Sequence, residues 1–305
     1  MKKWLWIICI IVLILIIVIS LRKNKLEIKD AKFEIEHDGL MRDYYVHVPS
    51  NYNNEKMPVV MYIHGGGGNV RSAYLDGMDK MSDKHGFLLV IPEGVGEKKL
   101  GELRASWNGG EWEGGKCCGN ADDVGFISKV IDDAKKNFNV DEKRIYATGI
   151  SNGGLMTNRI GCELADKVAA IATVAPAGIE SNCNPFRKIP VMDIHGTDDT
   201  CNPFDGSEPS NPICKTDYKR TSHEEVINFW MKENNCSEKS NIIYNNGGAL
   251  CISYTCSAEV VFCKVDGMGH AWPSGFESKT LGIYPVSQDI SFDQMWEFFE
   301  KHSLK

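Results

Sequence analysis

Residues 144–153 have the sequence Arg-Ile-Tyr-Ala-Thr-Gly-Ile-Ser-Asn-Gly, and this stretch decides the fold class. Residues 144–148 form a short, largely apolar run typical of a buried strand, and residues 152–164 have helical periodicity. Gly149 and Gly153 flank Ser151, as a tight turn between strand and helix requires where a Cβ atom has no room. The stretch therefore predicts a strained turn that exposes the hydroxyl of Ser151, a candidate nucleophile.

Outward from this turn, short apolar runs alternate with amphipathic segments. Two alternating strands, 31–36 and 41–48, come first. Continuous apolar runs then predict strands covered on both faces at 58–63, 87–91, 144–148, 169–175, 191–194 and 260–265. Helices are expected near 123–138, 152–164, 222–234 and 292–302. This order predicts an α/β fold: a mainly parallel central sheet flanked by helices, preceded by two antiparallel strands. The stretches 94–120 and 201–221 read as long loops, which are usually functional or heavily cross-linked.

The N-terminus and the charge balance limit location and partners. Residues 4–21 are apolar between cationic flanks and would span roughly 27 Å as a helix, so residues 1–25 are expected to be a signal anchor or a cleaved signal peptide. We favour the anchor, with membrane contact through residues 4–21. Residues 26–305 show no linker or repeat and predict one domain. The net charge of −7 makes nucleic acid an unlikely partner.

The eleven cysteines indicate an oxidising, extracytoplasmic location. Cys9 lies in the apolar run, and an even number, ten, remains for disulfides whose connectivity spacing alone does not give. Free buried thiols are the alternative. A cysteine zinc site is disfavoured because Cys117 and Cys118 are adjacent and no CxxC pair occurs. Neither a metal nor an organic cofactor is expected.

Serine needs a histidine base and an orienting carboxylate, in the chain order serine, acid, histidine. His270 follows a strand among turn residues, where a mobile base belongs. His195 instead resembles a structural turn, and His223 a polar helix start. The acid is expected after the strand 191–194, where Asp198 and Asp199 are both candidates that residue chemistry alone does not separate.

An oxyanion needs preorganised N–H donors. Asn152, directly after the serine, supplies one, and the glycine run 65–68 supplies the second through Gly66. A phosphate-binding loop is the alternative for this run, but the Lys-Ser/Thr ending of such loops is absent. Trp107 and Trp272 lie near these motifs and are predicted either to contact substrate or to pack in the core. Trp112 is expected to be structural or exposed.

Together these motifs resemble the secreted polyhydroxybutyrate depolymerase-like esterases, which include feruloyl and acetylxylan esterases of the α/β-hydrolase fold. The resemblance runs from about residue 31 to 302 and rests on the sequences at 64–68, 106–108, 117–126, 149–153, 195–199 and 269–273. It implies that Asp199 is the acid and that Cys236 pairs with Cys256. The chain lacks the length for the appended substrate-binding domain of polymer-degrading relatives, which favours short or solubilised esters.

The sequence thus predicts a serine esterase acting on a small ester or on an ester-decorated polysaccharide or polyester oligomer. Ser151 would attack the ester carbonyl, His270 transfer protons and Asp199 orient His270. An acyltransferase or peptidase with the same triad is the alternative within enzymes, because the triad fixes acyl chemistry and not the acceptor. A catalytically silent binding module is the alternative from another class.

Overall fold

The computed structural model describes residues 30–99, 102–112, 115–116, 119–179, 182–215, 219–279 and 282–305. The predicted signal or anchor segment and the pair Cys117 and Cys118 lie outside these ranges. Within the described ranges, no helix has the length and apolar character needed to cross a bilayer.

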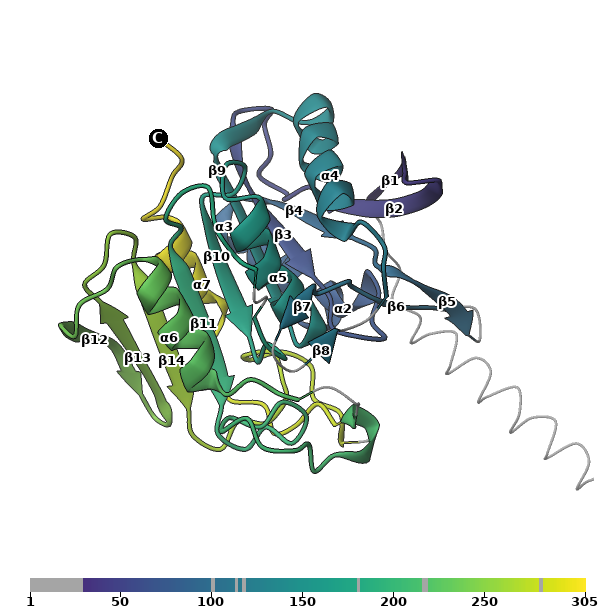
Figure 1. The fold of residues 1–305 in the computed structure, drawn as a ribbon. Coiled ribbons are helices and arrows are strands. Elements are labelled where there is room, and N and C mark those ends of the chain that lie inside the picture. Colours follow the sequence, from purple (N-terminus) through teal and green to yellow (C-terminus); the bar gives the residue numbers. More distant parts are fainter. Residues whose placement is uncertain are drawn as a thin grey trace, which may run out of the picture.

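A ten-stranded sheet forms the centre of the molecule (Figure 1), with the strand order β1-β2-β4-β3-β9-β10-β11-β14-β13-β12. Its six inner strands are parallel: β4 (Leu88–Pro92), β3 (Met57–Ile63), β9 (Val140–Ile150), β10 (Ala170–Val174), β11 (Val191–Gly196) and β14 (Val260–Val265). The antiparallel strands β1 (Ala31–His37) and β2 (Leu40–His47) lead in as predicted. Every residue of β3, β4, β10 and β11 is buried, which explains their continuous apolar sequences.

Helices cover both faces of the sheet (Figure 1). On one face α4 (Asp123–Asn137) and α5 (Asn152–Glu163) pack on the central strands, and α6 (His223–Glu233) packs on β11 and β14. On the other face lie α3 (Met78–His85) and α7 (Phe292–Phe299), which contact each other. The short helix α2 (Arg71–Leu75) precedes α3, and a 3-10 turn spans Pro212–Cys214. This three-layer arrangement confirms the predicted α/β architecture.

Three antiparallel strand pairs were not predicted. The stretch expected to be a loop between residues 94 and 120 contains β5 (Val95–Lys99) paired with β6 (Glu102–Ser106), and also the two-residue strands β7 (Glu111–Trp112) and β8 (Gly115–Lys116). The third pair lies at the far edge of the main sheet and consists of β12 (Ser240–Asn246) and β13 (Ala249–Tyr254). The β12 strand has no alternating pattern of apolar and polar residues, because its side chains are exposed on both faces of the sheet.

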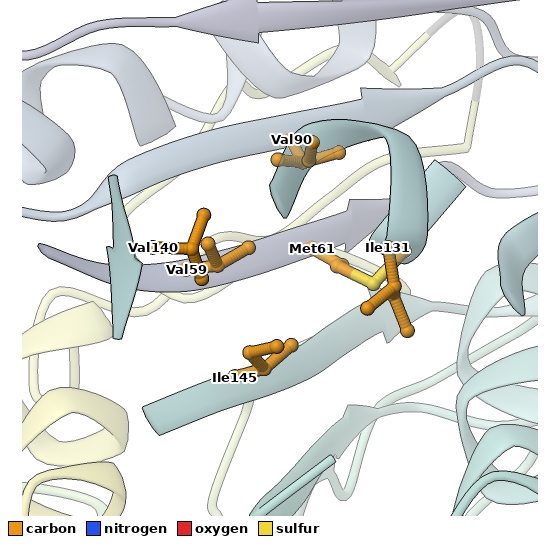
Figure 2. Close-up of a pocket in the computed structure, with 7 residues that line it drawn as sticks. Val59, Met61, Val90, Ile131, Val140 and Ile145 are labelled. Atoms are coloured by element: carbon orange, nitrogen blue, oxygen red, sulfur yellow. The ribbon is translucent and has the colours of Figure 1, made fainter. Parts of the chain in front are cut away.

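The core beneath α4 is apolar and close-packed. Figure 2 shows side chains of β3, β4 and β9 facing Ile131 of α4. The small gap that they enclose is lined by Val59, Met61, Val90, Ile131, Ala134, Val140 and Ile145, and it has no room for a water molecule. It is a packing feature that supports the central strands, and the polar side chains of interest lie elsewhere.

Four disulfides cross-link the described second half of the chain. They join Cys162 to Cys183, Cys201 to Cys214, Cys236 to Cys256 and Cys251 to Cys263. The pairing of Cys236 with Cys256 that the resemblance implied is confirmed. Cys251 and Cys263 face each other directly across β13 and β14. The Cys201–Cys214 bridge closes the loop that follows β11, and this loop carries Asp199.

Candidate active site

Ser151 occupies a strained turn at the carboxyl end of β9. Its φ is 61° and its ψ is −122°, a conformation rarely adopted by residues with a Cβ atom. A Cβ atom on Gly153 would lie 2.1 Å from the carbonyl oxygen of Ile63, and one on Gly149 would lie 2.6 Å from that of Gly153. Both positions therefore require glycine, as the sequence predicted. The turn is fixed by the Ser151 N–H, which donates to the Val174 carbonyl of β10 at 2.9 Å.

Asp199 and His270 meet at the same edge of the sheet. Because β11 and β14 are parallel neighbours, the loops after them begin side by side. The Nδ1 atom of His270 lies 2.8 Å from Oδ2 of Asp199. Asp198 instead is exposed and accepts a hydrogen bond from the Thr197 hydroxyl at 3.0 Å. The structure thus separates the two aspartates that residue chemistry left open, and it pairs His270 with Asp199.

The carboxylate of Asp199 is buried but well supported. Its Oδ1 accepts the N–H groups of Cys201 and Asn202, each at 2.8 Å. Burial alone would raise the pKa of Asp199, but the charge of His270, its hydrogen bond and the nearby His195 ring at 3.4 Å outweigh it and hold this pKa well below its ordinary value. Asp199 is therefore ionised at neutral pH and accepts the Nδ1 proton of His270.

Ser151 follows β9, Asp199 follows β11 and His270 follows β14. In the sheet order, β11 and β14 lie two and three places from β9, and all three residues follow the carboxyl ends of parallel strands. The loop after β14 is joined to the loop after β11, since the Asp198 N–H donates to the Met268 carbonyl at 2.9 Å. The Ser151 hydroxyl makes no hydrogen bond with any described residue. Catalytic contacts of this kind often tighten only when substrate is bound.

The glycine run after β3 passes directly over the start of α5. A Cβ atom on Gly65 would lie 3.6 Å from Cβ of Ser151, and one on Gly66 would lie 3.4 Å from Cβ of Asn152. The run is tied to β6, because the Gly67 N–H donates to the Ala105 carbonyl at 2.7 Å. The structure therefore brings the two predicted N–H donors, at Gly66 and Asn152, next to the predicted nucleophile.

The side chain of Asn152 secures a neighbouring segment. Its Oδ1 accepts the Trp107 N–H at 2.8 Å and its Nδ2 donates to the Trp107 carbonyl at 3.0 Å. The Trp107 indole N–H in turn donates to the His64 carbonyl at 2.9 Å. Burial lowers the pKa of His64 to about 4, so this histidine is neutral, and its Nε2 accepts the Gly94 N–H at 3.1 Å.

The two tryptophans predicted to touch substrate or core are both fully buried. Trp107 packs against the His64 ring at 4.9 Å, and Trp272 packs edge-to-face on Tyr62 at 5.3 Å. These contacts are those of the core-packing alternative, and substrate contact stays a prediction for both. The side chain of Trp112 lies outside the described part of the structure.

A cavity of about 330 Å³ lies beside the loop that carries Asp199. Its wall comes from residues 197–210 and includes Asp199, the ring of Phe204 and the carboxylates of Asp205 and Glu208. Besides Asp199, which is paired with His270, the wall carries the acidic residues Asp205 and Glu208, so it disfavours anionic groups.

Sequence reasoning missed one polar residue in this region. Asp193 lies in the middle of β11, fully buried, and its Oδ2 lies 2.5 Å from Nδ1 of His223. His195, two residues further along the same strand, is also fully buried. The signal was present in the sequence: an aspartate and a histidine two positions apart in an otherwise apolar strand must face the same side.

No protein-family model matches the chain. Over 182 residues it is 34% identical to feruloyl esterase B of Piromyces equi; the match covers 55% of this chain and 32% of that protein. The chain therefore spans about a third of that relative. A probable feruloyl esterase C of Aspergillus niger is 25% identical over 271 residues, which cover 85% of this chain and 83% of the relative.

Among solved structures, an acetyl xylan esterase from Aspergillus awamori matches with a TM-score of 0.57 and 15% identity, covering 88% of this chain and 99% of that one. The sheet order and this likeness define an α/β-hydrolase fold. Within that class, the chain is a homologue of the feruloyl esterases, which confirms the resemblance that its motifs indicated.

Proposed function

We propose that the protein is a serine esterase that hydrolyses carboxylic esters. The observation that carries the proposal is the meeting of Asp199 with His270 at 2.8 Å on the sheet edge where the strained turn presents Ser151. The esterase names of the homologues support the same chemistry. The four disulfides support an extracytoplasmic location.

In the proposed reaction, Nε2 of His270 takes the proton of the Ser151 hydroxyl as its oxygen attacks the ester carbonyl. Ionised Asp199 stabilises the imidazolium through Nδ1. The N–H groups of Gly66 and Asn152 donate to the oxyanion of the tetrahedral intermediate. Collapse releases the alcohol, which takes its proton from His270, and a water molecule activated by the same histidine then releases the acid from Ser151.

The substrate class that we propose is a neutral ester: an acetyl or feruloyl group on a polysaccharide, or a short hydroxyalkanoate oligomer. The acidic wall beside Asp199 supports a neutral, hydroxylated alcohol portion, because an anionic one would be repelled. The names of the relatives, feruloyl and acetyl xylan esterases, point to the same class.

The test compares the wild type with Ser151→Ala on p-nitrophenyl acetate, methyl ferulate, acetylated xylan and a hydroxybutyrate oligomer. We expect wild-type turnover of at least one ester, and a loss of about 10³-fold or more in the variant, because the nucleophile is gone. Matching circular dichroism spectra would show that both are folded. Equal activity, or none in either, would contradict the proposal.

Two further readouts separate the alternatives. Labelling of Ser151 by a fluorophosphonate probe is expected for any active serine hydrolase, and its absence from folded wild type would favour a silent binding module. Product analysis with added alcohols or amines distinguishes hydrolysis from acyl transfer, since the triad itself does not select the acceptor.

A further inference from the structure

Three buried side chains of metal-ligating type meet between β11 and the first turn of α6. Asp193 and His195 lie two positions apart on β11 and so face the same side, and His223 is the first residue of α6. Their exposed fractions are 0%, 0% and 2%. One ligand atom from each lies within 4.8 Å of the other two.

Several polar atoms of this cluster have no hydrogen-bond partner outside the cluster. Nδ1 of His195 and Nε2 of His223 have no hydrogen-bond partner among the described residues, and Oδ2 of Asp193 and Nδ1 of His223 contact only each other, at 2.5 Å. Buried polar groups are normally paired, because an unpaired one loses its interaction with water and gains nothing in return. Several such atoms in one place indicate a ligand that binds them together.

The remaining polar atoms of the cluster are oriented by neighbours. Nε2 of His195 lies 2.8 Å from the Asn202 carbonyl and must donate its proton there, so Nδ1 is the atom that holds a lone pair whenever the ring is neutral. The Thr173 hydroxyl donates to Oδ1 of Asp193, and Oδ2 faces Nδ1 of His223. Metal-binding histidines and carboxylates are typically oriented in this way, by a carbonyl or hydroxyl on the atom that does not bind the metal.

We propose that Asp193, His195 and His223 bind one divalent transition-metal ion of the zinc class. Two imidazole nitrogens and one carboxylate oxygen are a donor set that Zn²⁺ accepts, and harder ions such as Ca²⁺ prefer oxygen alone. Phe262 and Phe204 pack on the His223 ring at 4.0 and 4.9 Å and shield the cluster from water. Phe204 also lines the cavity beside Asp199, so its ring separates the cluster from that cavity.

The competing explanation is an ion pair without metal. The 2.5 Å contact between Asp193 and His223 has the length of a shared proton, and metal ligands about 2.1 Å from a tetrahedral zinc would stand about 3.4 Å apart. Metal binding therefore displaces this proton and opens the contact by about 1 Å. An ion pair alone leaves Nδ1 of His195 without a partner, whereas the metal site provides one, and this difference favours the metal.

The site would also help to position Asp199 of the proposed triad through His195. Nε2 of His195 lies 3.4 Å from Oδ2 of Asp199, the oxygen that holds His270. A metal on Nδ1 fixes the His195 ring and hence this contact. The metal would therefore act on the structure of the Asp199 loop and take no part in the chemistry.

The experiment uses the full chain, stripped of metal with a chelator, reloaded with Zn²⁺ and analysed by elemental mass spectrometry. We expect about one ion per wild-type chain and a rise in melting temperature on reloading, because a ligand of the native state stabilises it. Co²⁺ in place of zinc should give the strong visible absorption of a low-coordinate site. Asp193→Asn and His223→Gln should lose the ion and the absorption.

The matched control is His302→Gln, because His302 also pairs with a carboxylate, Glu259 at 3.0 Å, but lies outside the cluster. It should keep the ion. Wild type that takes up no ion and shows no thermal shift overturns the metal site, as does equal uptake by folded His223→Gln. If neither cluster variant folds, calorimetric titration of stripped wild type with Zn²⁺ decides. Esterase assays on the same samples are independent: activity without metal uptake refutes this inference alone.

Discussion

Asp198 and Asp199 are neighbours in the chain whose carboxylates have opposite surroundings. The Asp199 carboxylate is buried and lies within hydrogen-bond distance of His270, whereas Asp198 is exposed. We expect Asp199→Asn to lower kcat/KM by about 10⁴-fold, because an amide can donate to Nδ1 of His270 and hold the wrong tautomer. The matched change Asp198→Asn should stay within about twofold of wild type. Initial rates on the preferred ester measure both, and equal losses would remove Asp199 from the proposed triad.

Glu93 predicts a pH dependence of stability. Burial raises the pKa of this side chain to about 7, and its Oε1 accepts the Val70 N–H at 2.8 Å. Between about pH 4.5 and 7 the folded protein therefore binds a proton that the unfolded chain has released, so the free energy of unfolding falls as pH rises through this window.

Replacing Glu93 with glutamine removes this charge and keeps the oxygen that faces Val70. Between pH 5 and 8 the free energy of unfolding should fall less in Glu93→Gln than in wild type. We expect the two decreases to differ by roughly 3 kcal/mol at most. Urea unfolding at both pH values measures the difference. Some pH dependence will remain, because burial also raises the pKa of Asp76 to about 7. Parallel curves for the two proteins would contradict the assignment to Glu93.

Among the larger elements, two disulfides of similar loop length should have different roles. The Cys201–Cys214 bridge closes the loop that holds Asp199, and the Cys201 N–H donates to that carboxylate. We expect its replacement by two serines to lower kcat by about tenfold or more, because small displacements of catalytic groups are costly.

The Cys236–Cys256 bridge joins the end of α6 to the end of β13, at the edge of the sheet opposite the site. Its replacement by two serines should lower the free energy of unfolding by about 3 kcal/mol and leave kcat unchanged. Urea unfolding and initial rates on both double variants test the pair of expectations. A loss of activity confined to the second variant would reverse the assignment.

The elements that sequence reasoning found are those with a continuous apolar pattern. The parallel strands are buried on both faces, and their helices bury one stripe each, so both leave clear periodicities. The β12–β13 hairpin was missed because β12, at the sheet edge, carries exposed residues such as Ile242 and Ile243 on both faces. The pairing of β5 with β6 was missed because glycine and charged residues carry no such pattern.

For the site, chain order predicted which residues follow which strands, and the parallel sheet brought those strand ends to one edge. The choice of Asp199 over Asp198 came from resemblance, because two adjacent loop carboxylates differ only in how the backbone turns after residue 197. The Asp193 cluster was missed for a related reason. His223 is 28 positions beyond His195, and only tertiary packing of α6 on β11 brings them together.

At the scale of the whole molecule, the outermost strand β12 of the ten-stranded sheet is a site where two copies of the protein can aggregate. β12 is the last strand, and Ile242 and Ile243 are 63% and 45% exposed. Apolar residues on an unpaired edge promote strand addition by other molecules, and charge on such an edge prevents it. We expect Ile242→Lys to slow aggregation on heating with activity unchanged, measured by light scattering. Asn241→Lys, which adds charge without removing the apolar side chain, is the control and should have a smaller effect.

The disulfide connectivity also bears on how the chain reaches its native state. Among the described cysteines taken in chain order, the first joins the second and the third joins the fourth, so oxidation in chain order would join these four correctly. The last four are interleaved, because Cys251 lies between Cys236 and its partner Cys256. Sequential oxidation would first join Cys236 to Cys251. If oxidation proceeds in chain order, we therefore expect these two bridges to need thiol exchange, and a host without a disulfide isomerase to accumulate the Cys236–Cys251 form.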